Sequence, residues 1–303
     1  MSQRINRTEY RGGAQERGPR DFKTHVVKKE GNVMKIAEKN VVTTHPLNSV
    51  KNVAKLMKEH DFRRIPITDA GTKRLNGLAT AIDILDFLGG GEKYNIIAKD
   101  YNGNLAAAVN CPISKIMREA SFVDKTASVD DVVNIMLTKH TSAIPIVEDK
   151  KDKEVIAIVT ERDVMPHADV YGVTVEEVMR TDPIIATPGM MVSDVSKIMV
   201  RNGFRRLPVI KEHQLVGVVT VFDVLEFLGY GEFHGTDAEE ALSERVEEIM
   251  ISEAVTVEGG QDLGEVAKLV KETGIGGFPV VKDGCVVGVV TISDLIKAVY
   301  HGK

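Results

Sequence analysis

Four segments of this chain of 303 residues follow one pattern, and that internal repetition restricts the folds open to the sequence. In each segment a short aliphatic strand ends in the motif Thr-x-x-Asp, and an amphipathic helix follows. Another strand, entered through a proline, begins 15 to 18 residues before the aspartate. The four motif segments are NGLATAIDILDFLG (76–89), AIVTERDVM (157–165), VGVVTVFDVLEFLG (216–229) and VGVVTISDLIKAV (287–299), and the prolines are Pro66, Pro145, Pro208 and Pro279.

A complete unit contains more than these two strands. A helical segment with apolar residues spaced near 3.6 precedes each proline, as in VKNVAKLMKEH (50–60). A short β-branched strand, such as NVVTT (40–44) or IIAT (184–187), precedes that helix. The order is therefore β-α-β-β-α over about 60 residues, which predicts an α/β fold. A unit of this size buries too little apolar surface by itself, so neighbouring units are expected to pair.

The repeats alternate between two types. The first and third share FRRIP (62–66) and FRRLP (204–208), and both continue past the last helix as FLGGGEKY or FLGYGEF. The second and fourth have small residues in place of the arginine pair, so the chain looks like a duplicated two-repeat unit. We place the repeats at 34–92, 113–170, 174–232 and 244–300, after a tail at 1–33 that is expected to be disordered and basic, with eight Lys/Arg and four acids.

The composition excludes several classes of protein. Hydrophobic residues make up 43%, typical of a folded chain, and the net charge of −5 gives no overall attraction to nucleic acid or anionic membranes. No apolar run approaches the roughly 20 residues of a membrane span, and the N-terminus has no signal-peptide core. Cys111 and Cys285 fit no metal or redox spacing, so we expect a reducing cytoplasm and no metal site. No catalytic motif is present, so an enzyme is not expected.

The Thr-x-x-Asp motif has two interpretations. A single copy is most simply a capping box, with the threonine as helix cap and the aspartate near the positive end of the helix dipole. An aspartate there can also accept hydrogen bonds from both hydroxyls of a ribose, while the threonine and free helix N–H groups face a phosphate. The arginine pairs favour the second interpretation, because guanidinium groups bind phosphates; otherwise they are ordinary cations at exposed helix ends.

On these residues the four units resemble CBS domains, and their pairs resemble Bateman modules. The resemblance extends over residues 34 to 300, and MVRNGFRRLPV and FLGGGEKYN bring it closest to the four-CBS type of the gamma subunit of AMP-activated protein kinase and its archaeal homologues. It implies two Bateman modules in one disk-like assembly. It also implies a regulatory protein that senses energy state through AMP, ADP and ATP as ligands, without a cofactor, and that acts on a protein target.

The resemblance assigns roles by position. The motif aspartates would bind the ribose hydroxyls: Asp83, Asp163, Asp223 and Asp294. The residues beside phosphate would be Thr80, Thr160, Thr220, Thr291, Arg63, Arg64, Arg162, Arg205 and Arg206. The candidates for lining adenine, on the first strands, are Val41, Phe122, Ile185 and Val255.

In each pair the arginines of the odd repeat are expected to serve the aspartate of the even repeat. The favoured combinations are Asp163 with Arg63 and Arg64, and Asp294 with Arg205 and Arg206. The gamma subunit has a histidine–arginine pair in its even repeats, where this chain has Ser142-Ala143 and Gly276-Gly277. The clefts of Asp83 and Asp223 therefore face neutral partners and are expected to bind phosphate more weakly, unless arginines reach across the disk.

Two other classes of function stay open on the sequence alone. The chain could bind another adenosyl ligand, such as S-adenosylmethionine, or nucleic acid through its basic tail, or it could be a protein-interaction scaffold. S-adenosylmethionine is cationic at sulfur and needs no arginine pair, so FRRLP argues against it. A protein-interaction scaffold does not require Thr-x-x-Asp motifs opposite arginines, so their presence argues against that class. We expect an adenine-nucleotide sensor without membrane association.

Overall fold

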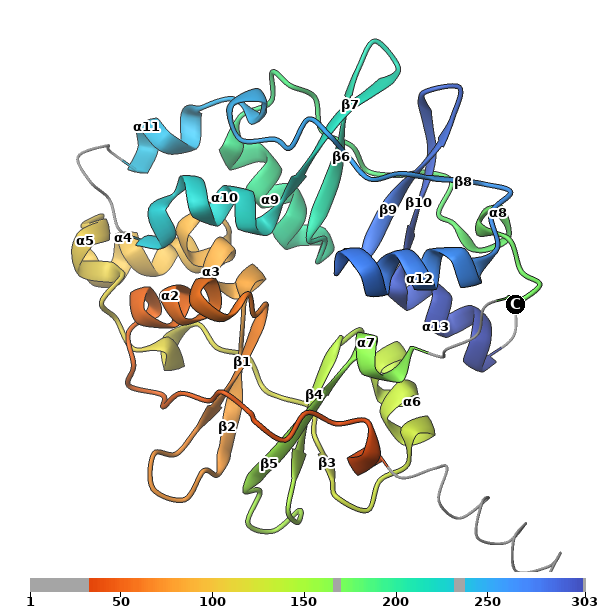
Figure 1. Ribbon diagram of the computed structural model, residues 1–303. Coiled ribbons are helices and arrows are strands. Elements are labelled where there is room, and N and C mark those ends of the chain that lie inside the picture. The colour runs from red at the N-terminus through yellow and green to blue at the C-terminus, as the bar shows by residue number, and fades with distance from the viewer. Residues whose placement is uncertain (1–32, 166–169, 232–237, 302–303) are drawn as a thin grey trace, which may run out of the picture.

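Four similar α/β units surround a common centre in the computed structural model of the chain (Figure 1). The structure describes residues 33–165, 170–231 and 238–301. The tail expected at 1–33 lies outside the described residues except for Val33, which is buried at the start of the 3-10 helix η1 (Val33–Lys35). No helix within the described ranges combines the length and the apolar character needed to cross a membrane.

Repeats one and two form the lower half of the view in Figure 1. Repeat one consists of α2 (Val50–His60), β1 (Arg64–Thr68), β2 (Leu75–Thr80) and α3 (Ala81–Leu88). Repeat two consists of β3 (Val123–Asp124), α6 (Val129–Lys139), β4 (Ala143–Val147), β5 (Val155–Thr160) and α7 (Glu161–Val164). The connection between them contains η2 (Glu92–Tyr94), α4 (Asn95–Tyr101), α5 (Leu105–Ala108) and η3 (Ile113–Lys115).

Repeats three and four form the upper half of the same view. Repeat three follows α8 (Val175–Val178) and consists of α9 (Val192–Asn202), β6 (Arg206–Lys211), β7 (Gln214–Thr220) and α10 (Val221–Phe227). The connection contains η4 (Gly229–Gly231), α11 (Ala238–Ser243) and η5 (Val246–Glu248). Repeat four consists of β8 (Val257–Glu258), α12 (Leu263–Thr273), β9 (Gly277–Lys282), β10 (Cys285–Thr291) and α13 (Ile292–His301).

Each repeat is built on an antiparallel hairpin whose first strand contains the proline. In repeats two and four a short parallel strand, β3 or β8, extends the hairpin. In repeats one and three the strands expected at 40–44 and 184–187 are reduced to one parallel bridge each, Thr44 with Ile67 and Ala186 with Val209. A pairing between β7 and β10 joins repeats three and four into one five-stranded sheet.

The chain that leads into a repeat lies against the sheet of the paired repeat. Arg118, in the opening segment of repeat two before β3, bridges to Leu78 in β2 of repeat one. Arg180, in the opening segment of repeat three just after α8, bridges to Val289 in β10 of repeat four. Because Leu78 and Val289 lie two residues before a motif threonine, these bridges bring an arginine to the motifs of repeats one and four.

A small hydrophobic core joins repeats one and two within their module, and two large ones cross between the modules. In one, Leu85 of α3 is buried with Val195 of α9 and Val224 of α10, so repeats one and three share it. In the other, Val132 of α6 is buried with Leu295 of α13, so repeats two and four share it. The two modules therefore face each other in the closed, disk-like arrangement that the resemblance to Bateman modules implied (Figure 1).

The long helix before each proline ends in a left-handed residue. Gly203, with φ 67°, follows α9, and His140, with φ 50°, follows α6. A Cβ on Gly203 would meet nothing within 4 Å, so the change Gly203→Ala tests backbone conformation alone. We expect it to lower the free energy of unfolding by about 1 kcal/mol in urea denaturation, because an L-residue is disfavoured there.

The matched control is Gly189→Ala. Gly189 also has open space around it, but its φ is not in the left-handed region. Its replacement is expected to leave stability unchanged or slightly raised, because alanine restricts the unfolded chain. Equal effects of the two changes would contradict the conformational explanation.

Candidate functional site

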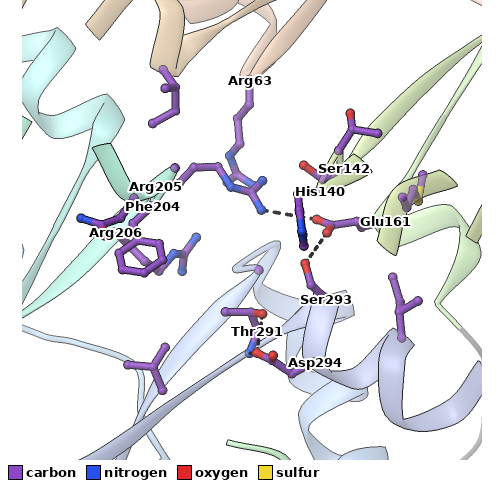
Figure 2. Close-up of a pocket in the computed structure, with 18 of the residues that line it drawn as sticks. Arg63, His140, Ser142, Glu161, Phe204, Arg205, Arg206, Thr291, Ser293 and Asp294 are labelled. Atoms are coloured by element: carbon purple, nitrogen blue, oxygen red, sulfur yellow. Dashed lines mark hydrogen bonds and ion pairs between the residues drawn. The ribbon is translucent and has the colours of Figure 1, made fainter. Parts of the chain in front are cut away.

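A cavity of about 1140 Å³ lies where the four repeats meet. Pockets for drug-sized ligands are typically about 300–1,000 Å³, so this one has room for a nucleotide. Its lining is rich in polar and cationic side chains from every repeat. Figure 2 labels Arg63, His140, Ser142, Glu161, Phe204, Arg205, Arg206, Thr291, Ser293 and Asp294 around it.

All four Thr-x-x-Asp motifs form the helix cap that a single copy predicts. In α3, Thr80 Oγ1 donates to Asp83 Oδ2 at 2.6 Å, and the N–H of Thr80 donates to the same oxygen at 3.0 Å. Corresponding caps link Thr160 with Asp163, Thr220 with Asp223, and Thr291 with Asp294. The cap uses carboxylate oxygen Oδ2, so the surroundings of Oδ1 distinguish the four clefts. Of the threonines, Thr80, Thr220 and Thr291 line the central cavity and Thr160 does not.

Asp294 is the motif aspartate that lines the cavity. Its side chain is 12% exposed, and its Oδ1 lies 3.7 Å from Nε of Arg180. Arg205 and Arg206 line the same cavity (Figure 2), and Ile184 adds an apolar surface to it. A carboxylate and two guanidinium groups therefore share one space, in the combination of Asp294 with FRRLP that the sequence predicted.

Asp83 is enclosed by the protein itself. Its side chain has no exposed surface, and Lys93 Nζ lies 2.5 Å from its Oδ1. Arg118 donates from Nη2 to Oδ1 at 2.6 Å and from Nε to Oδ2 at 3.0 Å. The sequence predicted neutral partners for this cleft. The structure instead gives the carboxylate two cations, because the bridge from Leu78 brings in Arg118 and the loop after α3 returns Lys93.

Asp163 and Asp223 are not among the residues that line the cavity. Burial raises the pKa of Asp223, and its hydrogen bonds with Thr220 act in the opposite direction. Arg63 and Arg64, which the sequence assigned to the cleft of Asp163, do line the cavity. The structure therefore brings together only one of the two favoured aspartate–arginine combinations, that of repeat four.

Arg64 and Arg206 hold equivalent positions, and each reaches the even repeat of its own module. Arg64 donates from Nη2 to Ser142 Oγ, and Arg206 donates from Nη1 to the carbonyl of Gly277 at 2.7 Å. Burial, followed by the charges of other arginines, lowers the pKa of Arg64 to about 9 and that of Arg206 to about 10. These directions mean that the charged guanidinium groups are held in a place that lacks a full counter-charge.

Arg63 and Arg205 instead reach across to the other module. The guanidinium carbon of Arg63 lies 5.9 Å from the ring centroid of Phe222 in repeat three. Arg205 donates from Nη2 to Glu161 Oε2 in repeat two at 3.3 Å. Burial, followed by the charges of Arg162 and Arg205, lowers the pKa of Arg63 to about 10. Arg162 makes the same kind of crossing, to a backbone carbonyl of repeat four. The five arginines thus cluster at the joint between the modules.

Sequence reasoning missed the cations that approach the motif carboxylates. Arg118 and Arg180 lie in IMREA (116–120) and VMRTD (178–182), at similar places near the start of repeats two and three. That recurrence was a usable signal, although only the bridges to the neighbouring sheet show which aspartate each arginine meets. Lys93 lies in FLGGGEKY, after α3. It contacts Asp83 only because the chain folds back toward the start of that helix, which the sequence does not show.

Glu161 was also missed. It is 8% exposed at the first position of α7, directly after the motif threonine. The other repeats have Ala81, Val221 and Ile292 there. The sequence could have pointed to Glu161, because the position after the motif threonine is a carboxylate in repeat two and apolar in the other three repeats.

The residues suggested for adenine do not line the cavity: Val41, Phe122, Ile185 and Val255. Pro183 and Ile184 line it instead, and Ile184 is 39% exposed. Successive side chains of an extended segment point to opposite sides, so a shift of one residue decides which side chain enters the cavity. Ile185 and Phe122 therefore have direct neighbours in the cavity lining, namely Ile184 and Ser121, whereas the segments of Val41 and Val255 contribute no lining residue.

The family model of the CBS domain matches this chain four times, at residues 33–90, 113–168, 175–230 and 246–301. Protein MJ1225 of Methanocaldococcus jannaschii is 37% identical over 276 residues, which cover 88% of this chain and 98% of that protein. A 33.4 kDa protein from a ribosomal RNA operon of Thermofilum pendens is 26% identical over 255 residues, 82% of this chain and 84% of that one.

Solved structures agree with these sequence matches. The crystal structure of MJ1225, described as a proposed archaeal homolog of g-AMPK, has a TM-score of 0.83 at 36% identity and covers 88% of this chain and 99% of that chain. A Pyrococcus horikoshii protein shares the fold at a TM-score of 0.57 and 20% identity, again with 88% and 99% coverage. The chain therefore belongs to the CBS domain family, as a tandem protein whose four CBS domains form two Bateman modules.

Proposed function

We propose that this chain is a regulatory protein that binds the adenine nucleotides AMP, ADP and ATP, and that the cleft of Asp294 is its main binding site. One observation carries the proposal: Asp294 and the pair Arg205 and Arg206 line the same cavity. One ligand can therefore meet an acceptor for ribose hydroxyls and charged donors for phosphate at once.

The ribose end rests on Oδ1 of Asp294. The capping bonds from Thr291, at 2.9 Å and 2.6 Å, both use Oδ2. Arg180 Nε, at 3.7 Å from Oδ1, is beyond hydrogen-bond distance and leaves that oxygen available as an acceptor. Pro183 and Ile184 supply apolar surface in the same cavity, in reach of the base. The cavity thus offers apolar side chains for adenine, a carboxylate for ribose and guanidinium groups for phosphate.

The phosphate end rests on the arginine cluster. Burial and neighbouring arginines lower the pKa of Arg206 to about 10, which means that its charge is disfavoured by its surroundings. A phosphate placed there supplies the missing counter-charge and can accept bidentate hydrogen bonds. S-adenosylmethionine, which carries a positive sulfur and no phosphate, offers neither. The cavity chemistry therefore favours nucleotides over that alternative.

The remaining clefts rank below that of Asp294. At Asp83 a ribose would have to displace Arg118 and Lys93 from a carboxylate with no exposed surface. Asp163 and Asp223 lie outside the cavity lining, so their clefts are expected to fill with nucleotide only at higher concentrations than the cleft of Asp294. The other candidates for phosphate contact keep their assignments within this proposal: Thr80, Thr160, Thr220, Thr291, Arg63, Arg64 and Arg162.

A sensing role follows from where the site lies. The cavity is lined by all four repeats, so a ligand in it contacts both Bateman modules and can change how they fit together. The similarity to MJ1225, described as a proposed homolog of g-AMPK, supports energy sensing as the purpose. In this scheme AMP, ADP and ATP compete for the cleft, and a protein target in the cytoplasm reads the resulting arrangement.

The change Asp294→Ala tests the site. It removes a charge-assisted acceptor for ribose hydroxyls, and such bonds contribute roughly 1.5–3 kcal/mol each. We expect the affinity for AMP, measured by calorimetric titration, to fall at least tenfold while the protein stays folded. An unchanged titration would mean that the aspartate is only a helix cap.

Asp131→Ala is the matched control for that change. Asp131 forms the same capping box with Ser128 in α6, with bonds of 2.9 Å and 2.7 Å to one carboxylate oxygen, and it does not line the cavity. Its loss is expected to cost helix-cap stability without any effect on AMP affinity. The pair of variants thereby separates the ligand role from the capping role.

A further inference from the structure

Glu161 is a buried carboxylate of the first module that bonds to both repeats of the second. Its Oε2 accepts from Arg205 Nη2 of repeat three at 3.3 Å. Its Oε1 accepts from Ser293 Oγ of repeat four. Figure 2 shows both bonds at the middle of the cavity. One side chain therefore links three of the four repeats at the centre of the disk.

The surroundings of Glu161 are strongly cationic. The negative charge of Glu161 acts on Arg63 and Arg64 and raises their pKa, whereas burial lowers it. It thus acts as a counter-charge inside the arginine cluster. That is the electrostatic role assigned above to a phosphate, and both anions would use the guanidinium of Arg205.

We propose that Glu161 is an internal competitor for the phosphate site, and that exchange of Arg205 between Glu161 and a bound phosphate couples nucleotide occupancy to the joint between the two modules. This inference rests on the proposed function and names its regulation. A phosphate bound to Arg205 would lie next to the Glu161 carboxylate, because both anions contact the same guanidinium group. Two neighbouring anions repel each other. Binding therefore weakens the bond that Glu161 makes across the joint, and Glu161 in turn limits the affinity for phosphate.

The competition predicts a gain of binding when the charge is removed. In Glu161→Gln the affinity for AMP is expected to rise about tenfold, and that for ATP by at least as much, because the repulsion grows with ligand charge. Adenosine, which has no phosphate, is expected to bind as before. Calorimetric titrations of the three ligands at one ionic strength measure this.

Glu119→Gln is the control for charge alone. Glu119 lines the same cavity and is exposed, and none of the bonds that the structure describes joins it to Arg205. Its effect on AMP is expected to stay below about twofold, since an exposed charge is screened. Equal gains in the two variants would overturn the competition. A loss of AMP affinity in Glu161→Gln would also overturn it, by showing that Glu161 positions Arg205 for phosphate.

The coupling has its own readout in amide hydrogen exchange. AMP is expected to speed exchange in α7 and in the first turn of α13, and Glu161→Gln is expected to show that faster exchange without AMP. If AMP binds and exchange there is unchanged, the coupling is wrong. If the wild-type protein binds no nucleotide, the proposed function itself fails. Should glutamine disturb folding, Glu161→Ala repeats the test with the residue found at Ala81 in repeat one.

Discussion

Replacement of both Arg205 and Arg206 by glutamine is expected to weaken AMP and ATP binding by about 2 kcal/mol or more and to leave adenosine nearly unchanged. Both guanidinium groups line the cavity that contains Asp294, and Arg–phosphate contacts are charge-assisted and often bidentate. Neutral adenosine has no phosphate to engage them. The measurement is calorimetric titration of the three ligands at fixed salt, because ionic strength alone changes the effect of exposed charges.

The same variant is expected to keep or raise the melting temperature without ligand. Burial, with the charges of Arg63 and Arg205, lowers the pKa of Arg206 to about 10. A pKa that is lower in the folded than in the unfolded state means that the charged form opposes folding, and this penalty is fully present below about pH 10. Its removal offsets the loss of the bond to the carbonyl of Gly277.

Arg201→Gln is the matched control for the arginine variant. Arg201 is an exposed cation in the last turn of α9, a few residues before FRRLP, and it does not line the cavity. We expect no change in nucleotide affinity. If the double variant loses adenosine as much as AMP and melts at a lower temperature, the arginines serve stability and the phosphate role is wrong.

Asp83→Ala is expected to lower the free energy of unfolding by about 3 kcal/mol, because it leaves two cations without their buried partner. Arg118 and Lys93 both contact this carboxylate at 2.6 Å or less, and the aspartate has no exposed surface. The cost stays at the lower end of the range for a broken buried pair, because the Arg118 side chain is 50% exposed and can turn to water. Urea denaturation gives the value.

The comparison that decides this prediction is with Asp131→Ala. Asp131 supplies the same capping box in α6, but its carboxylate lies at the exposed surface. Its loss is expected to cost about 1 kcal/mol, the usual value of a helix cap. Similar costs for Asp83 and Asp131 would mean that the pairs with Arg118 and Lys93 contribute nothing to stability.

The two aspartates show how one motif serves different ends. In repeats one and four the threonine caps the helix in the same way, through Oδ2 of Asp83 or Asp294. In repeat one the chain's own cations occupy the other oxygen, whereas in repeat four Arg180 stays at 3.7 Å. The motif alone therefore predicts a cap in every copy, and the neighbouring segments decide which copy is open to a ligand.

The sequence by itself determined the repeat, its elements and the positions of the chemical groups. The Thr-x-x-Asp caps and the hairpins through proline depend on residues a few positions apart, and local periodicity reports such contacts directly. The alternation of repeat types is seen by comparing one repeat with another. The sequence also predicted that the arginines of each odd repeat serve the aspartate of the next repeat, and of those two combinations only Asp294 with Arg205 and Arg206 shares the cavity. The strands expected at 40–44 and 184–187 were wrong in extent, since each makes only a single bridge, such as that of Ala186.

Only the tertiary structure decided which repeats share a core and which charges meet. Repeats one and three pack together, and so do two and four, although a whole repeat lies between the members of each pair in the chain. That packing places Glu161 between Arg205 and Ser293, and the bridge to Leu78 places Arg118 on Asp83. Contacts of this kind arise from surfaces that become neighbours only after both modules have folded, so no spacing along the chain encodes them.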